Sequence, residues 1–421
     1  MNIQFFDILD TVGNTLDLVD PHLSDHHRKV AHIAERIASA MNFSPQETNN
    51  LVYAGLLHDC GALTLREKTF IAQLDMDSRD SNHAETGYNM LREFRLFANL
   101  ATLVRHHHIA WNHGSGAETH GEPTPMGCHI LHVADRVAVQ IDNKVPALAQ
   151  TNTIREKIRQ RAGRILHPDV VAAFEEICAP PAFWFDLFNQ NLSEILKSNT
   201  NAGTLRISLT ELEELSRFIA TIIDFRCRFT ATHSQGVAIT AEHIARRVGM
   251  SHREQTMMRI AGFLHDLGKL AVPTEILYKT GPLTPEEMGI MQIHTYVTYH
   301  SLRPIKELAT INEWASFHHE TIDGKGYPFR IPGRNLVLGA RIMSIADIFT
   351  ALTEDRPYRP GMSQSQVQEI LASLVAKEKI DPMVCAVVTN NFAEIDYHRR
   401  QAQNLAQEKY RGFAKESNLT E

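Results

Sequence analysis

Two adjacent histidines and a glycine-containing turn stand out at residues 318–328, His-His-Glu-Thr-Ile-Asp-Gly-Lys-Gly-Tyr-Pro. Imidazole is the most common protein ligand for transition metals, so the pair His318-His319 is a candidate for metal binding. Gly324 and Gly326 permit backbone conformations that other residues rarely adopt, and Pro328 makes the following turn rigid. The stretch therefore combines candidate metal ligands with a shaped loop beside them.

Other histidines and aspartates in the second half of the chain could complete a metal site with this pair. They are His233, His265, Asp266, His294 and Asp347. Because tens of residues separate them, they lie on different helices, which a helical bundle can bring together at one inward-facing site. Seven nitrogen and oxygen ligands are too many for one tetrahedral zinc ion. They suit two divalent metals bridged by a carboxylate, and Asp266 is the natural bridge because it adjoins His265. A ligand set without thiolate favours iron or manganese, with zinc, nickel and magnesium as alternatives.

Such a site suits phosphoester chemistry. Two metals held about 3.5–4 Å apart can clamp the attacking and leaving oxygens of a phosphoester and lower the pKa of a bound water. Lys269 lies four residues after His265, one helical turn on, and Arg341 lies six residues before Asp347. We expect both cationic side chains to contact phosphate, and Asp266 to orient the attacking hydroxide as well. Asp266 and Lys269 are therefore the candidate catalytic residues.

The same pattern of histidines and aspartates recurs in the first half of the chain. A shift of 207 residues places His26 on His233 and His58-Asp59 on His265-Asp266. Shifts of 211 and 212 residues align the others: His83 with His294, His107-His108 with His318-His319, and Asp135 with Asp347. At seven places a histidine therefore aligns with a histidine, or an aspartate with an aspartate. This self-similarity indicates two copies of one domain.

Helical signals dominate both copies. Apolar residues recur at helical spacing, and Ser44, Ser251 and Thr284 each stand three residues before a glutamate, as in a capping box. Short alternating β-branched runs are scarce. The sequence therefore predicts an all-α fold of two tandem helical bundles related by duplication.

The repeat also suggests where the domains begin and end. The polar stretch near 195–205 reads as a linker. We place an N-terminal domain at residues 1–198, a C-terminal domain at residues 199–397 and a charged, apolar-poor tail at residues 398–421.

Composition excludes several classes of protein. A net charge of −7 gives no electrostatic basis for binding DNA. No stretch approaches the roughly 20 apolar residues of a membrane span, and the first residues contain no targeting signal. The five cysteines are scattered without a Cys-x-x-Cys pair, which fits a reducing compartment. We expect a cytoplasmic protein that contacts neither DNA nor membrane.

Taken together, these motifs resemble the HD-GYP subfamily of the HD superfamily of metal-dependent phosphohydrolases. The resemblance covers about 230–395 and rests on several stretches of this sequence. They are His265-Asp-Leu-Gly-Lys269, Pro273, Ile276-Leu277, Lys279, His294, His318-His-Glu320, Asp323-Gly-Lys-Gly-Tyr-Pro328, Arg341-Ile342, Ala346-Asp347 and Arg356-Pro-Tyr358. The family hydrolyses bacterial cyclic dinucleotides, chiefly cyclic di-GMP and in some members 3′,3′-cyclic GMP-AMP. The resemblance implies a phosphodiesterase that opens such a ring to a linear dinucleotide.

The resemblance also implies roles for individual residues. The expected metal ligands are His233, His265, Asp266, His294, His318, His319 and Asp347. The expected substrate-contacting residues are Lys269, Arg341, Gly324, Gly326, Tyr327 and Pro328, while Glu320 is expected to support its neighbours rather than bind metal. Members with three metals carry a glutamate four residues before the first histidine. Phe229 stands there in this chain and cannot bind metal, so we expect two metals.

The N-terminal copy keeps every ligand type but not the rest of the motif. Its candidate metal site comprises His26, His58, Asp59, His83, His107, His108 and Asp135. Ala62 and His129 stand where the second copy has Lys269 and Arg341, and no tyrosine-proline turn follows the histidine pair. Three interpretations compete: a metal-bound regulatory or packing domain, which we favour, a second hydrolase with another substrate, or a structural relic with an empty site.

Two alternatives to a cyclic-dinucleotide hydrolase stay open at this point. One is a signalling module that binds a cyclic dinucleotide, or a partner protein, without cleaving it. The other is a broader nucleotide phosphohydrolase of the HD type. A homodimer or a protein signalling partner is compatible with each of these functions.

Overall fold

The computed structural model describes residues 3–18, 24–62, 82–119, 121–201, 204–226, 232–355 and 360–416. The described residues are mostly helical, as the sequence predicts, and the chain divides into two compact units. One unit is Gln4–Arg206, and the other is Ile207–Glu421 together with Met1–Ile3. Among the described residues, no helix combines the length and apolar character needed to cross a bilayer.

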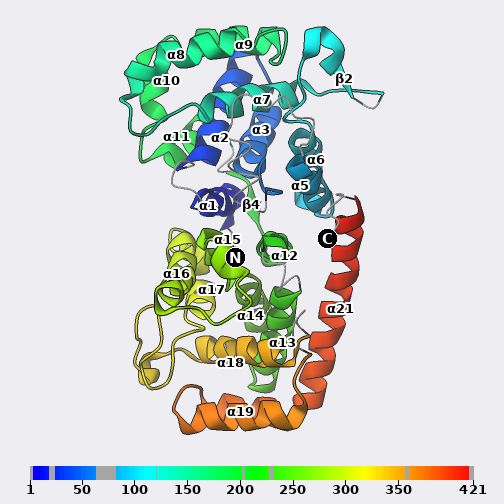
Figure 1. Cartoon of the computed structure of the whole chain (residues 1–421), viewed down its shortest axis with the longest axis vertical. Helices are drawn as coiled ribbons and strands as arrows, with labels where there is room; N and C mark the ends of the chain where they lie inside the picture. The colour runs from blue at the N-terminus through cyan, green and yellow to red at the C-terminus, as the bar shows by residue number, and fades with distance from the viewer. Residues whose placement is uncertain are drawn as a thin grey trace. The chain divides into compact units, whose positions relative to one another are not determined.

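The N-terminal unit contains ten α-helices among its described residues, with short 3₁₀ helices and strands between them (Figure 1). The helices are α1 (Phe5–Asp17), α2 (His26–Ala40), α3 (Pro45–Leu57), α5 (Asn82–Arg92), α6 (Ala98–Arg105), α7 (Met126–Ala138), α8 (Ala147–Arg159), α9 (Pro168–Ile177), α10 (Pro181–Asp186) and α11 (Leu192–Asn199). The 3₁₀ helices are η2 (Arg95–Phe97) and η3 (Asn112–Ala117). Strands β2 (Glu118–Thr119) and β3 (Glu122–Pro123) pair antiparallel, and β1 (Ile3–Gln4) pairs with β4 (Arg206–Ile207) where the chain enters and leaves this unit.

The C-terminal unit contains ten α-helices among its described residues. They are α12 (Leu209–Arg226), α13 (His233–Arg247), α14 (His252–Leu264), α15 (Thr274–Leu277), α16 (Pro285–Leu302), α17 (Ala309–Ser316), α18 (Leu338–Thr353), α19 (Gln364–Ala376), α20 (Pro382–Asn390) and α21 (Phe392–Glu416). The 3₁₀ helices are η5 (Leu267–Ala271), η6 (Lys306–Leu308) and η7 (Gly333–Asn335). The segment predicted as a tail from residue 398 begins inside α21.

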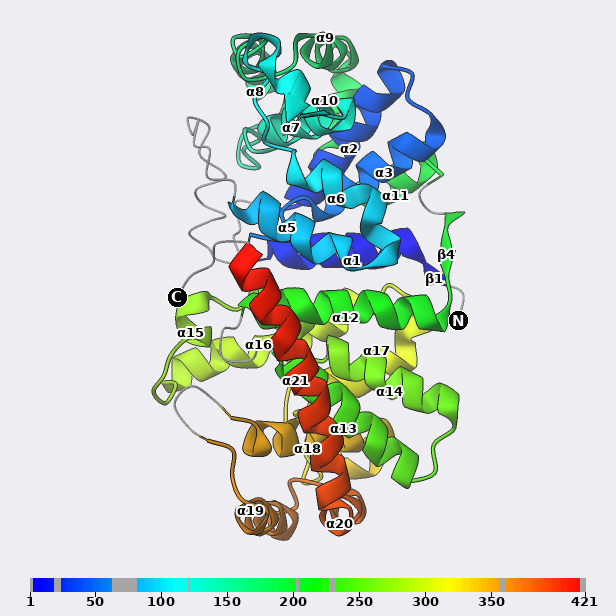
Figure 2. The same cartoon turned by 90° about the vertical axis from the view of Figure 1, so that its right-hand side faces the viewer.

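The two units share one packing scheme. In the N-terminal unit α2 packs against α3 and α7, and α5 packs against α6. In the C-terminal unit α13 packs in the same way against α14 and α18, and α16 packs against α17. α21 adds a further partner and runs alongside α13 (Figure 2). The structure thus repeats the duplication seen in the sequence.

Local sequence explains where the long helices begin. Ser44 and Ser251 each accept the backbone N–H of a glutamate three residues on, whose side chain binds the cap residue's backbone in return. Thr284 makes the same capping box at the start of α16. These reciprocal bonds satisfy N–H groups that have no partner within the helix. The three predicted capping boxes are therefore confirmed.

Glycines allow the helices beside the candidate ligands to approach closely. A Cβ on Gly262 would lie 2.5 Å from Ala238 Cα, and one on Gly55 would lie 2.8 Å from Ala31 Cα. These positions correspond at the shift of 207 residues. In both units a missing Cβ thus lets the helix that ends in the His-Asp pair pack against the helix that carries the first candidate ligand.

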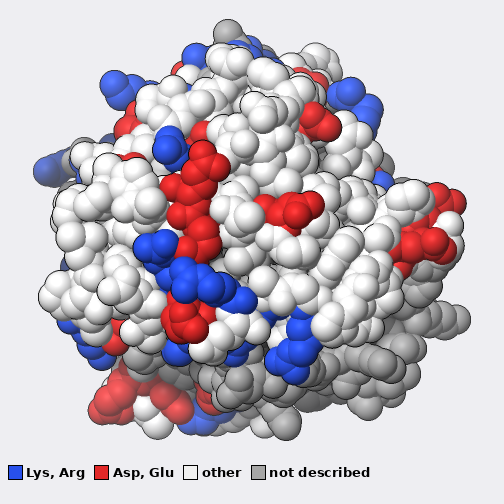
Figure 3. All heavy atoms as spheres, turned by 90° about the horizontal axis from the view of Figure 1, so that it is seen from above, with Lys and Arg blue, Asp and Glu red and all other residues white. Residues whose placement is uncertain are grey.

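Acidic and basic side chains lie interspersed among uncharged ones on the face drawn in Figure 3. The ion pairs between α8 and α9 include Arg155 with Glu175 and Arg159 with Glu175, at 2.7 and 2.8 Å. Mixed charge of this kind agrees with the modest net charge of the chain.

Two glycine-to-alanine changes within the C-terminal unit should shift stability in opposite directions. Gly262→Ala forces a Cβ against the backbone of α13 and should lower the free energy of unfolding by about 1–3 kcal/mol. Gly289→Ala, in the exposed part of α16 where a Cβ meets nothing within 4 Å, should stabilise by about 0.5–1 kcal/mol. Denaturant unfolding followed by circular dichroism measures both. Equal effects of the two changes would contradict this account of the packing.

Candidate metal centre

Five separate parts of the C-terminal unit bring its predicted ligands to one place. His233 is the first residue of α13, and His265 and Asp266 follow the last residue of α14. The others come from α16, the segment after α17, and α18: His294, His318, His319 and Asp347. Their ligand atoms form two groups, His233 with His265 and Asp347, and His294 with His318 and His319, each with all ligand atoms within 4.8 Å of one another.

Most of these imidazoles are oriented by the helix that carries them. Nδ1 of His265, His294 and His318 lies 2.8, 2.7 and 2.6 Å from the carbonyl oxygen three residues earlier. Since a carbonyl only accepts, Nδ1 is the protonated nitrogen and Nε2 keeps a free lone pair. Each ring therefore turns its Nε2 toward the cluster, which is the arrangement that metal-binding histidines need.

Asp266 lies between the two groups. Its Oδ2 is 3.1 Å from His265 Nε2, and its Oδ1 is 3.6 Å from His294 Nε2. One carboxylate oxygen thus faces each group, so Asp266 could contribute a ligand atom to a metal held by either group. Gly268 makes this approach feasible, because a Cβ there would collide with the carbonyl oxygen of His294.

The protonation of the cluster suits metal binding. Burial lowers the pKa of His294 to about 3, so that imidazole is neutral at pH 7. Burial alone would raise the pKa of Asp266, yet His265 and Lys269 hold it well below its usual value. His265 Nε2 is buried without a hydrogen-bond partner. A neutral imidazole such as that of His294, an ionised carboxylate and a buried nitrogen without a hydrogen-bond partner are donors that divalent metals use, so the residues present fit the two metals predicted from sequence.

His233 contacts carboxylates through both of its ring nitrogens. Its Nε2 lies 3.1 Å from Asp347 Oδ1, while its Nδ1 lies 3.1 and 3.2 Å from the two oxygens of Glu354. Although burial opposes it, the charges of Glu354 and Asp347 raise the pKa of His233 to about 10. Glu354 could not be predicted from the sequence, because no motif connects it with a histidine 121 residues away.

The two predicted phosphate-binding cations lie in different surroundings. Lys269 Nζ is 2.5 Å from Asp266 Oδ2, at the edge of the cluster. Arg341 donates to Asp381 at 3.0 Å and to the Leu336 carbonyl oxygen at 2.6 Å. Lys269 thus lies beside the central aspartate of the cluster, whereas Arg341 braces the segment before α18. The phosphate contacts of both residues stay predictions.

The predicted substrate loop follows the histidine pair directly. Gly324 has a positive φ of 68°, and Gly326 lies so close to Glu320 Cα that a Cβ would be 2.5 Å from it. Tyr327 and Pro328 are joined by a cis peptide bond, and the tyrosine ring lies 4.8 Å from the His319 ring. The loop therefore holds an aromatic side chain beside the candidate ligands.

Glu320 holds this loop in place. It is 1% exposed, and its two carboxylate oxygens accept the backbone N–H groups of Phe329 and Ile331 at 2.6 and 3.0 Å. The structure thus gives Glu320 a supporting contact, as the sequence analysis expected. The sequence did not indicate which backbone N–H groups Glu320 would bind.

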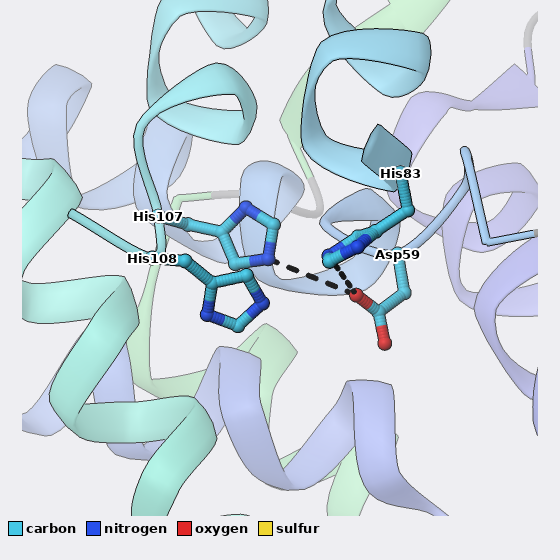
Figure 4. Close-up of side chains that lie close together, drawn as sticks. All are labelled: Asp59, His83, His107 and His108. Atoms are coloured by element: carbon cyan, nitrogen blue, oxygen red, sulfur yellow. Dashed lines mark ion pairs between the residues drawn. The ribbon is translucent and has the colours of Figure 1, made fainter. Parts of the chain in front are cut away.

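The N-terminal unit contains a matching cluster. Asp59, His83, His107 and His108 gather their ligand atoms within 4.8 Å (Figure 4). Asp59 also belongs to a group with His26 and His58. Asp59 Oδ1 lies 3.5 Å from His83 Nε2 and 3.7 Å from His107 Nε2, while its Oδ2 lies 3.5 Å from His58 Nε2. Asp59 therefore occupies the position that Asp266 has in the other unit.

Asp135 closes the N-terminal cluster but carries an additional partner. Its Oδ1 lies 3.4 Å from His26 Nε2, and its Oδ2 accepts from Arg136 at 2.6 Å. Against the effect of burial, Arg136 and His58 lower the pKa of Asp135 to about 2. Ile348 stands at the position of Arg136 in the second copy. The clusters thus share ligand types and differ in the charge beside them.

Several buried atoms of the N-terminal cluster have no hydrogen-bond partner. They are Asp59 Oδ1, His83 Nε2, His107 Nε2 and Asp135 Oδ1. Unpaired buried polar atoms are costly, and a cation among them would remove that cost. The first copy therefore also fits a metal. The histidine beside His26 pairs with a different carboxylate, since His27 Nδ1 lies 2.5 Å from Asp17 Oδ1.

Two features of the sequence argument lie outside the described residues. One is Phe229, on which the expectation of two metals rather than three rests. The other is the stretch Arg356-Pro-Tyr358, which formed part of the family resemblance.

Comparison with known proteins identifies a domain in each half. A family model described as an HD domain matches residues 23–140, and a second model with the same description matches residues 217–384. The second match contains the complete C-terminal cluster, and the first contains the complete N-terminal one.

Among curated proteins, a 3′3′-cGAMP-specific phosphodiesterase of Vibrio cholerae is 27% identical over 399 residues, covering 93% of this chain and 92% of the relative. The cyclic di-GMP phosphodiesterase response regulator RpfG of Xanthomonas campestris is 38% identical over 169 residues, covering 39% of this chain and 44% of the relative. Among solved structures, a cyclic GMP-AMP-specific phosphodiesterase of V. cholerae matches with a TM-score of 0.66 and 22% identity, covering 93% of this chain and 98% of that one. The last likeness shows the fold and extends it over both halves.

Removing the Glu320 carboxylate should loosen the loop. In Glu320→Ala the backbone N–H groups of residues 329 and 331 lose their acceptors, so their amide hydrogens should exchange about tenfold faster, the factor that corresponds to about 1.4 kcal/mol of lost stabilisation. Hydrogen–deuterium exchange with peptide resolution measures this. Glu286→Ala, at an exposed glutamate of α16, is the control and should change nothing there. Unchanged exchange in Glu320→Ala would show that the carboxylate does not hold the loop.

Proposed function

Because the chain belongs to the HD superfamily and carries two HD domains in tandem, we propose that its C-terminal half is a metal-dependent phosphodiesterase. Its substrates would be bacterial cyclic dinucleotides, 3′,3′-cyclic GMP-AMP, cyclic di-GMP or both, and its products linear dinucleotides. One observation carries the proposal: a buried aspartate with one oxygen toward each of two groups of candidate ligands.

The residues of this site have separable tasks. His233, His265 and Asp347 would hold one metal, His294, His318 and His319 the other, with Asp266 between them. Two bound divalent metals would supply a nucleophile at neutral pH and neutralise charge on the phosphoryl oxygens. Asp266 would accept a proton from, or orient, the attacking oxygen, and Lys269 would stabilise negative charge that develops on the phosphate.

The substrate class rests on the relatives and on the loop. Curated relatives act on 3′3′-cGAMP or on cyclic di-GMP according to their names. The loop at residues 323–328 places the Tyr327 ring beside the cluster, where an aromatic face can pack against a flat substrate group. The N-terminal half lacks this tyrosine-proline turn. We therefore assign cleavage to the C-terminal half and a metal-bound regulatory or packing role to the N-terminal one.

A non-cleaving signalling module is the second candidate. Loss of a ligand would favour it, yet all seven predicted ligands of the C-terminal cluster lie together. A complete ligand set supports cleavage over simple binding. A nucleotide phosphohydrolase of broader range is the third candidate, and the substrate panel below separates it from the other two.

Replacing the bridging aspartate tests the assignment. The purified full chain, with Mn²⁺ or Fe²⁺ under reducing conditions, should convert cyclic di-GMP or 3′,3′-cyclic GMP-AMP to linear products resolved by chromatography. Asp266→Asn should lower this rate at least about 100-fold, because replacing a residue that only supports a ligand already lowers metal affinity or activity by about 10–100-fold. Asp169→Asn, an exposed aspartate of α9, is the matched control and should keep the full rate.

Three results would contradict the proposal. Wild-type protein that binds both dinucleotides without forming product would indicate the signalling module. Faster cleavage of nucleoside mono- or triphosphates than of either cyclic dinucleotide would indicate the broader phosphohydrolase. Loss of cleavage in Asp59→Asn, with full cleavage in Asp266→Asn, would assign the reaction to the N-terminal half.

A further inference from the structure

One ligand of the C-terminal cluster is oriented by a side chain rather than by its own helix. His265, His294 and His318 each direct Nδ1 at a carbonyl oxygen of the preceding turn. His233 is the first residue of α13 and has no preceding turn of that helix. Its Nδ1 instead lies 3.1 and 3.2 Å from the two oxygens of Glu354. Glu354 therefore takes the place that a backbone carbonyl has for the other rings.

Glu354 is itself held from two sides. It directly follows Thr353, the last residue of α18, and its backbone N–H donates to the Thr350 carbonyl oxygen at 2.9 Å. Its side chain is 6% exposed and accepts Gln403 Nε2 at 3.1 Å. The same amide nitrogen lies 3.2 Å from the carbonyl oxygen of Thr232, the residue before His233. One glutamine of α21 thus contacts both the carboxylate and the backbone that leads into the ligand.

Gln403 is fixed by its neighbours on α21. Its side-chain oxygen accepts from Arg399, which also donates to Asp396 at 2.6 Å and to the Thr353 carbonyl oxygen at 3.2 Å. Arg399 is 3% exposed and Gln403 is 8% exposed. A buried chain of contacts therefore leads from α21 through Glu354 to His233. Both of these α21 residues belong to the segment that the sequence analysis predicted as a tail.

We propose that Glu354 positions His233 as a metal ligand, and that Gln403 of α21 positions Glu354. This inference rests on the function proposed above and names two positioning residues for the same site. A carboxylate that accepts Nδ1–H fixes the ring, selects the tautomer with a free Nε2 and makes that nitrogen a better donor. The C-terminal helix is then part of the metal centre's support, although it supplies no ligand.

The N-terminal copy does not share this arrangement. At the shift of 212 residues that aligns Asp135 with Asp347, Asp142 stands at the position of Glu354. Asp142 is exposed, and its side chain accepts the backbone N–H of Lys144 at 2.8 Å. Its backbone N–H donates to Gln150 at 2.9 Å. The support by Glu354 and Gln403 is therefore a feature of the C-terminal unit, the one that carries the tyrosine-proline loop.

Metal affinity tests the inference without any substrate. Mn²⁺ titration of the full chain should show about 10–100-fold weaker binding at one class of sites in Glu354→Ala. Glu354→Gln should bind between wild type and Glu354→Ala, since an amide oxygen still accepts Nδ1–H but carries no charge. Gln403→Ala should weaken binding several-fold. The matched controls are Glu369→Ala and Gln401→Ala, at exposed positions of α19 and α21, and should bind as wild type does.

A double-mutant cycle separates positioning from general stability. In a His233→Ala background, Glu354→Ala should cost less than about twofold in Mn²⁺ affinity, because the residue on which it acts is gone. An equal cost in both backgrounds would overturn the proposal, as would wild-type affinity in Glu354→Ala, Glu354→Gln and Gln403→Ala together. If Glu354→Ala does not fold, Glu354→Gln and Gln403→Ala still decide the question.

The same titration distinguishes this inference from the proposed function. Wild-type affinity in all three variants, with dinucleotide cleavage intact, refutes the positioning role alone. If the variants bind Mn²⁺ more weakly than wild type, but the wild-type chain cleaves no cyclic dinucleotide, the positioning role is supported and the proposed function is refuted.

Discussion

The structure of each half depends on one electrostatic constraint: a buried aspartate surrounded by imidazoles. Asp266 and Asp59 each lie between two groups of histidines, with one carboxylate oxygen toward each group. Burial opposes ionisation of both carboxyls, yet nearby histidines hold their pKa values well below the usual range. A buried cluster of imidazoles and ionised carboxylates is stabilised when cations occupy it. The helices, glycines and capping boxes act together to hold that arrangement.

The two halves show how one scaffold can keep a ligand set and change what lies around it. The histidines and aspartates correspond one to one, and so do the glycines that let the helices approach. Around them the copies diverge. The C-terminal cluster has Lys269 at its edge, a tyrosine-proline loop held by Glu320, and Glu354 behind His233. The N-terminal cluster has Arg136 on its second aspartate instead. Shared ligands therefore do not imply a shared reaction.

Much of this arrangement could be predicted from the sequence, because the same pattern of candidate ligands occurs in both copies of the repeat. A histidine or aspartate that recurs at a fixed shift is constrained by its role, so the fourteen candidate ligands could be recognised before the fold was known. The helical class followed from periodicity and from the capping residues Ser44, Ser251 and Thr284. The domain boundaries were placed from the repeat and from the polar and charged stretches at its ends, and the precise limits given at residues 198 and 397 stay predictions.

The contacts that support the ligands could not be predicted in the same way. Glu354 and Gln403 meet His233 through packing of α18 and α21 against α13, which no local pattern records. The charged composition after residue 398 suggested a tail. Arg399 and Gln403 are polar residues of that segment, and their burial depends on partners in other helices that the sequence does not reveal. Arg341 was predicted from its residue type to bind phosphate, and its contact with Asp381 depends on the position of α20.

The central claim is that the C-terminal cluster holds two metals with Asp266 between them. A crystal structure of the full chain loaded with Mn²⁺, with anomalous diffraction recorded near the manganese absorption edge, tests this most directly. The account predicts two anomalous peaks about 3.5–4 Å apart in the C-terminal cluster, each bound by one oxygen of Asp266. A single peak, two peaks that Asp266 does not connect, or manganese in the N-terminal cluster alone would contradict it.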